Sequence, residues 1–70
     1  MPKLPVIKPK ELIRKLHKLG FVDDHQTGSH LIMLHPKTNK RAVVPHHLRE
    51  IPKGTLNSLL KEAGISREEI

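Results

Sequence analysis

Histidine supplies most of the side chains in this chain that could carry acid–base chemistry. The sequence has six histidines in 70 residues and no cysteine. Imidazole has an unperturbed pKa of about 6.5, so it can accept or donate a proton near neutral pH. His30 follows Gly28 and Ser29 at the start of an apolar run, where a rigid element meets backbone that can approach a phosphate. We therefore take His30 as the first candidate for a general acid or base.

The other histidines divide into one further candidate pair and three isolated residues. His46 and His47 follow Pro45 at the end of a later apolar run, a position where site residues often collect. If the first hairpin loop is Thr27-Gly28, His25 faces His30 across the strand pair. A solvated or hydrogen-bonded histidine without a chemical role is the alternative at each position, and for His17 and His35 we expect an ordinary surface position.

We expect no bound metal and no cofactor. His25, His30 and His35 are five residues apart, an odd offset that places His30 and His35 on opposite faces of a strand. No cysteine or histidine–carboxylate pair at a recognised spacing supports them. The chain also has no glycine-rich phosphate loop and no Gly-x-Ser-x-Gly nucleophile motif.

The charge balance favours a polyanionic partner. Thirteen Lys and Arg against seven Asp and Glu give a net charge of +6, and nucleic acid is the commonest such partner, with an anionic membrane as the rival. No apolar run reaches membrane-spanning length, and residues 1–5 hold no run of signal-peptide length. We expect a cytoplasmic protein without membrane contact. RNA also brings its own nucleophile, the 2′-hydroxyl, so a histidine base and nearby cations suffice for strand scission.

The mode of RNA binding follows from the lack of aromatic residues. Phe21 is the sole aromatic side chain, so bases have no stacking platform and RNA would be bound through phosphates, 2′-hydroxyls and shape. The basic residues concentrate in the first helical segment, which carries Lys10, Arg14, Lys15 and Lys18. We predict that these four contact phosphates, with a merely solvated helix face as the alternative.

Two helices and three strands must position these residues. Apolar residues recur at helical spacing from Pro9 to Gly20 and from the Pro52–Gly54 entry to Gly64. Between them, residues 21–26, 31–34 and 41–44 form three short runs separated by turn residues, which predicts an antiparallel meander. The expected fold is a single α+β domain over residues 1–70. Both helices cover one face of the sheet, and the other face must meet water, RNA or protein.

The outer face of this sheet is not cleanly polar. The second strand places Ile32 and Leu34 on one side and Leu31 and Met33 on the other, so both sides carry apolar residues. We hypothesise that a partner chain covers part of the outer face or the adjacent edge. A strand buried on both sides by loops is the alternative.

Several short motifs, read in order, resemble a known family. They are Gly28-Ser29-His30, Val43-Val44-Pro45-His46-His47, Pro52-Lys53-Gly54-Thr55-Leu56 and Lys61-Glu62-Ala63-Gly64-Ile65. In a basic chain of 70 residues, this order and spacing resembles the HicA toxins, the small ribonuclease partners of HicB antitoxins in toxin–antitoxin pairs. The resemblance extends from the first helix to the tail at Ser66.

This resemblance implies a double-stranded-RNA-binding-domain-like fold, α-β-β-β-α. It also implies an mRNA interferase: a metal-independent endoribonuclease that cleaves mRNA and stops translation and growth until a HicB-like antitoxin neutralises it. The family's catalytic histidine stands in a Gly-Ser/Thr-His motif, which maps to His30. Its Pro-x-His segment maps onto residues 45–47 and makes His47 a candidate second site residue, although the doubled histidine leaves the choice between His46 and His47 open. Ser29 and Lys53 join the expected RNA contacts. For Lys53, we rank a structural role at the start of the second helix before RNA contact.

Two readings from other classes remain open at this point. A non-catalytic RNA-binding module fits the charge and the expected fold equally well. A protein-interaction domain with an acidic partner fits the apolar outer face. Only a cleavage assay separates the first of these from a ribonuclease.

Overall fold

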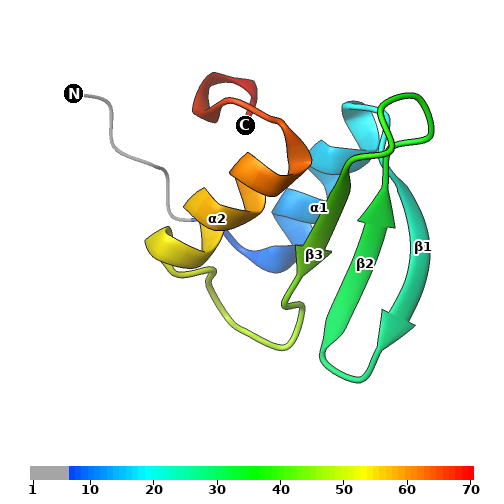
Figure 1. Ribbon diagram of the computed structural model, residues 1–70. Helices are drawn as coiled ribbons and strands as arrows, with labels where there is room; N and C mark the ends of the chain where they lie inside the picture. Colours follow the sequence, from blue (N-terminus) through cyan, green and yellow to red (C-terminus); the bar gives the residue numbers. More distant parts are fainter. Residues whose placement is uncertain (1–6) are drawn as a thin grey trace.

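The computed structural model describes residues 7–70, which form two helices and a three-stranded sheet (Figure 1). The order along the chain is α1 (Pro9–Lys18), β1 (Val22–Thr27), β2 (His30–Leu34), β3 (Arg41–Val44) and α2 (Lys53–Ala63), with a final 3-10 turn over Arg67–Glu69. This arrangement confirms the predicted α+β class and the double-stranded-RNA-binding-domain-like order α-β-β-β-α.

Helix α1 begins and ends at the residues that the sequence indicates. Pro9 occupies the first turn, where its missing N–H costs no hydrogen bond. The Lys8 backbone N–H donates to the Glu11 carboxylate at 3.4 Å. After Leu19 the chain turns at Gly20, whose φ of +101° suits glycine. Helix α2 ends in the same way at Gly64, which has a φ of +71°.

The three strands form an antiparallel sheet in the order β1-β2-β3. Thr27 pairs with His30, so the hairpin loop is Gly28-Ser29, and the Thr27-Gly28 loop that would bring His25 opposite His30 is not formed. Gly28 has a φ of +25° and takes the first loop position, where tight hairpins require a positive φ. The register therefore places His25 opposite Ile32, and the predicted pairing of His25 with His30 does not form. A bulge between Asp23 and His25 shifts the register further.

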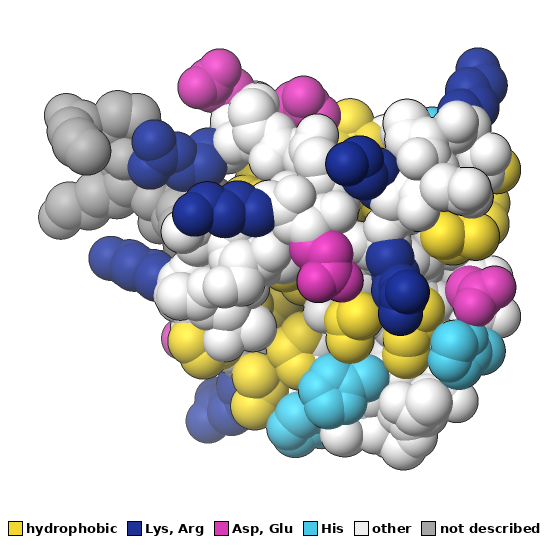
Figure 2. Space-filling model, in the orientation of Figure 1, with side chains coloured by type: hydrophobic (Ala, Val, Ile, Leu, Met, Phe, Trp, Pro, Cys, Tyr) yellow, Lys and Arg dark blue, Asp and Glu magenta, His cyan; other side chains and the backbone are white. Residues whose placement is uncertain are grey.

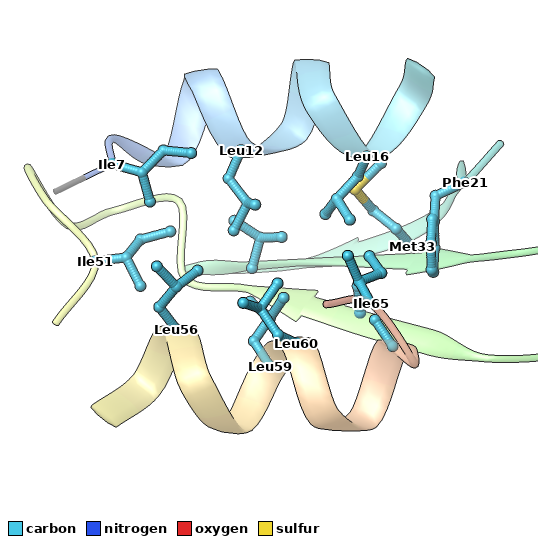
Figure 3. Close-up of a cluster of buried hydrophobic side chains, with 13 residues drawn as sticks. Ile7, Leu12, Leu16, Phe21, Met33, Ile51, Leu56, Leu59, Leu60 and Ile65 are labelled. Atoms are coloured by element: carbon cyan, nitrogen blue, oxygen red, sulfur yellow. The ribbon is translucent and has the colours of Figure 1, made fainter. Parts of the chain in front are cut away.

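One face of the sheet and both helices enclose the core (Figure 3). Met33, Ala42 and Val44 from the inner face of the sheet are fully buried. They meet apolar residues of α1 and α2, of which Leu12, Leu16 and Leu56 are also fully buried. Burying one such side chain stabilises the fold by about 1.5–3 kcal/mol, so this single cluster carries most of the stability.

The opposite face of the sheet carries half-exposed apolar side chains, as predicted. Ile32 and Leu34 on β2 and Val43 on β3 are each only partly buried. Their ladder partners share this outer face, and among them Val22 is 50% exposed. The alternative of a strand buried on both sides is therefore wrong within the described residues.

His35 ties the end of α1 to the sheet. Its ring packs edge-on against Phe21, with ring centres 5.1 Å apart, and its Nε2–H donates to the Leu19 carbonyl oxygen at 3.1 Å. The Lys37 backbone N–H donates to the Nδ1 atom of the same ring. These contacts half-bury His35, so its predicted surface position is wrong.

Residues 1–5, in which no signal-peptide-like run is expected, lie outside the described residues. Within residues 7–70, neither helix has the length and apolar character needed to cross a membrane.

Candidate functional site

The β1–β2 hairpin loop positions His30. Gly28 and Ser29 form the loop, and His30 is the first residue of β2. The Ser29 hydroxyl lies 3.2 Å from the Nδ1 atom of His30. His30 is half-buried, so its ring is held by the loop and still reaches the surface.

The segment after β3 returns to this same loop. The Nδ1 atom of His47 lies 3.2 Å from the Ser29 carbonyl oxygen, and the Nε2 atom of His46 lies 3.1 Å from the Gly28 carbonyl oxygen. Because a carbonyl oxygen only accepts, each of these ring nitrogens carries a hydrogen and donates it. Two consecutive histidines thus fasten the segment after β3 to the hairpin loop.

His30 and His47 come together at the surface. Their ring centres are 5.9 Å apart and their planes make an angle of 62°. Ser29 contacts the Nδ1 atom of both rings, with its hydroxyl on His30 and its carbonyl on His47. Within residues 7–70, neither Nε2 atom has a hydrogen-bond partner in the protein, so both are available to a ligand.

The pair lies in an open groove of about 860 Å³ between β3 and α2. Val43 and Pro45 contribute apolar surface to the groove, while residues of α2 contribute hydroxyls and a carboxylate, namely Thr55, Ser58 and Glu62. Figure 2 shows histidine side chains gathered at the lower end of the molecule beside an apolar surface. A groove with two imidazoles and an open side can admit a segment of an extended polymer.

Cations border this groove on the side of α1. A second depression of about 380 Å³ shares Leu48 with the groove and is lined by Lys8, Lys10, His46 and Arg49. His46 therefore lies on the cationic side, whereas His47 faces His30 in the groove. Sequence reasoning missed Lys8 and Arg49, although their positions beside the first helix and the Pro-His-His segment were a usable signal.

The structure divides the predicted RNA-binding residues between two ends of the molecule. Lys10 borders the groove, Arg14 is exposed one turn further along α1, and Lys53 is exposed at the start of α2 beside the groove residue Gly54. Lys15 and Lys18 lie in the last turn of α1. That turn lies at the other end of the sheet. His17 in this turn bonds Asp23 at 2.8 Å, and Asp23 is near the start of β1, whereas the hairpin loop follows the end of that strand.

The remaining histidines form pairs away from the groove. His17 bonds Asp23, and His25 bonds its neighbour Asp24 at 2.7 Å, with all four side chains largely exposed. Across residues 7–70, no three histidine or carboxylate side chains lie close enough together to hold a metal ion.

Comparison with known protein families places most of this chain in one family. The family model of the HicA toxin of bacterial toxin–antitoxin systems matches residues 9–65, which is well over half of the chain. The matched range runs from the first residue of α1 to the residue after Gly64, so it includes the hairpin loop, the segment after β3 and α2. Among curated proteins, none matches the chain.

Proposed function

Because the chain belongs to the HicA toxin family, and is thus the toxin of a toxin–antitoxin pair with a cognate antitoxin partner, we propose that it is an endoribonuclease that cleaves mRNA. The observation that carries this proposal is the groove lined by His30, whose Nε2 atom has no protein partner among residues 7–70, next to a depression lined by cations. An imidazole can remove the proton of a 2′-hydroxyl, and nearby cations can bind the phosphate oxygens.

The proposed reaction needs no metal ion, because RNA supplies its own nucleophile. His30 removes the proton from the 2′-oxygen, which attacks the adjacent phosphorus and displaces the 5′-oxygen of the next nucleotide. The products are a 2′,3′-cyclic phosphate and a free 5′-hydroxyl. Cleaving transcripts in this way would stop translation and growth, and it would act in the cytoplasm, where mRNA is translated.

The proposed RNA contacts surround this groove. Lys10 and Arg14 project from α1, and Lys53 begins α2 beside the groove. Lys15 and Lys18 would bind phosphates only of an RNA that continues along α1 past the groove. The Ser29 hydroxyl, which contacts His30, would reach an RNA bound at that ring.

We further propose that the cognate antitoxin is HicB-like and covers the groove together with the adjoining outer face of the sheet. Val43 belongs to both surfaces, so they are continuous. Ile32 and Leu34 would bury apolar area, and the net charge of +6 would attract an acidic partner. An antitoxin in this position would exclude RNA from His30.

A cleavage assay in excess EDTA tests the nuclease. The purified protein, its His30→Ala variant and a His17→Ala control are incubated with a long single-stranded transcript, and each fold is checked by circular dichroism. We expect the protein and the control to cleave, and His30→Ala to lose about 10²- to 10⁴-fold in rate. Cleavage by a folded His30→Ala variant would contradict the role of His30. Binding without cleavage by any of the three would make the chain an RNA-binding module.

A further inference from the structure

We infer that His47 is the second catalytic residue of this site and acts as the general acid opposite His30. The inference rests on the proposed function and adds to it the group that protonates the leaving 5′-oxygen. It also decides between the two neighbouring histidines, because His47 lies in the groove with His30 and His46 does not.

The spacing of the two rings suits a shared phosphodiester. The ring centres are 5.9 Å apart and the ring planes are inclined at 62°, so the two imidazoles lie within reach of one phosphodiester bound in the groove. A catalytic acid or base must come within hydrogen-bond distance, about 2.6–3.2 Å, of the atom it serves. Two imidazoles that line one groove can therefore serve the attacking 2′-oxygen and the leaving 5′-oxygen of the same phosphate, which lie on opposite sides of the phosphorus.

The environment of His47 favours the acid role. Its Nδ1–H donates to the Ser29 carbonyl oxygen, and this bond persists when Nε2 gains a proton. The Glu62 carboxylate lines the same groove as His47. His47 is also exposed to solvent, so its charged form keeps contact with water.

His30 has the partner expected of a base. The hydroxyl of Ser29 can accept the Nδ1–H of a neutral imidazole, which leaves Nε2 with a free lone pair. Ser29 thus holds both rings by their Nδ1 atoms, which leaves both Nε2 atoms without a protein partner among residues 7–70.

The proton balance of the reaction closes with these two groups. Nε2 of His30 takes the proton of the 2′-hydroxyl as the bond from the 2′-oxygen to phosphorus forms. The bond from phosphorus to the 5′-oxygen breaks, and the 5′-oxygen takes the proton held on Nε2 of His47. Exchange with water then returns a proton to His47 and removes one from His30.

A substrate with a better leaving group shows whether His47 acts as a general acid or has only a structural role. Cleavage positions are first mapped on a transcript. An oligonucleotide is then made in which sulfur replaces the 5′-bridging oxygen at a mapped position. A thiolate leaves without protonation, so a variant that lacks only the general acid should recover on this substrate. A variant that lacks the base, or that binds or folds poorly, should not recover.

The variants are His47→Ala, His47→Asn, His30→Ala and the His17→Ala control. Asparagine retains a side-chain N–H that can donate to the Ser29 carbonyl oxygen, so His47→Asn preserves the loop contact and lacks Nε2. On normal RNA we expect both His47 variants to lose about 10²- to 10⁴-fold in rate. On the sulfur substrate we expect them to come within about tenfold of the unaltered protein, whereas His30→Ala stays slow on both substrates.

Two results would overturn the inference and leave the nuclease proposal intact. One is normal cleavage by the His47 variants alongside an inactive His30→Ala. The other is an equal loss by the folded His47→Asn variant on both substrates. If the unaltered protein cleaves neither substrate, the proposed function itself fails.

Discussion

Gly20 lies so close to His35 that a Cβ atom at position 20 would stand 2.7 Å from the His35 Nε2 atom. We predict that Gly20→Ala destabilises the fold, because it would displace this ring and strain a backbone with a φ of +101°. The expected cost is about 2 kcal/mol or more, which lowers the melting temperature by roughly 10 °C in a domain of this size. Thermal unfolding followed by circular dichroism measures it.

Gly54→Ala is the matched control for this prediction. A Cβ atom at Gly54 in helix α2 would meet nothing within 4 Å. Alanine should therefore stabilise the protein by about 0.4–1 kcal/mol. Equal melting temperatures for the two variants would show that Gly20 is not constrained by His35.

The coupling between Gly20 and His35 gives a second prediction. His35→Ala loses the hydrogen bond to Leu19 and the edge contact with Phe21, at an expected cost of about 1–3 kcal/mol. In that background, Gly20→Ala should cost less than it does alone, because the colliding ring is gone. Urea unfolding of the four proteins of this cycle measures the difference. Additive costs would mean that only the backbone conformation matters at Gly20.

RNA affinity should depend most on the cations that border the groove. For a single strand, the logarithm of the binding constant falls with the logarithm of salt concentration by about 0.7 per phosphate contact. In a His30→Ala background that prevents cleavage, we expect Lys10→Gln with Arg49→Gln to weaken binding and reduce this slope by about 1 to 1.4. Lys15→Gln with Lys18→Gln should have a smaller effect. Fluorescence anisotropy at several salt concentrations measures these binding constants. An unchanged slope for Lys10→Gln with Arg49→Gln would mean that these two residues are solvated and bind no phosphate.

The hydroxyl of Ser29 should contribute to the rate of cleavage more than to binding. Ser29→Ala removes the contact with Nδ1 of His30 and keeps the carbonyl that holds His47. One hydrogen bond contributes about 0.5–1.5 kcal/mol, so kcat should fall by up to about tenfold. KM should stay within about twofold. A rise in KM at constant kcat would instead make Ser29 an RNA contact that has no part in positioning His30.

The antitoxin should lose affinity when a charge enters the outer face of the sheet. Ile32→Glu places a carboxylate among half-exposed apolar side chains, so the isolated toxin should still fold. An antitoxin that covers this face would bury the charge, and we expect at least a tenfold weaker complex in calorimetric titration. Gln26→Glu is the control, because Gln26 is exposed and its ladder partner Leu31 belongs to the other face. Equal loss in both variants would place the antitoxin elsewhere.

Local signals in the sequence were sufficient to predict the elements of this fold. Pro9 and Gly20 bracket α1, and Gly64 ends α2, because proline and glycine act through backbone geometry that needs no tertiary contact. The third strand, Arg41–Val44, lies where a short run between turn residues predicts it. The hairpin register could be predicted only to within one residue, because Thr27-Gly28 and Gly28-Ser29 are both plausible turns and the bulge at Asp24 leaves no local signal.

The arrangement of the site was only partly accessible from sequence. The role of His30 could be predicted from its motif. The proximity of His47 to His30 depends on how the chain after Pro45 folds back onto the hairpin loop. That return is made by hydrogen bonds to two loop carbonyls, which no periodicity encodes. The separation of Lys10 from Lys18 follows from the direction of α1 across the sheet, which is likewise a tertiary feature.

Strand β1 affects how the toxin associates with other copies of itself when no antitoxin is bound. All six of its residues are exposed, and it forms one edge of the sheet. Such an edge could recruit a strand from another copy and start aggregation. The carboxylates of Asp23 and Asp24 place charged groups along this edge, and the bulge interrupts the regular row of backbone groups that a second copy would pair with. The same irregularity that hid the register from the sequence thus makes this edge a poorer template for pairing with another strand.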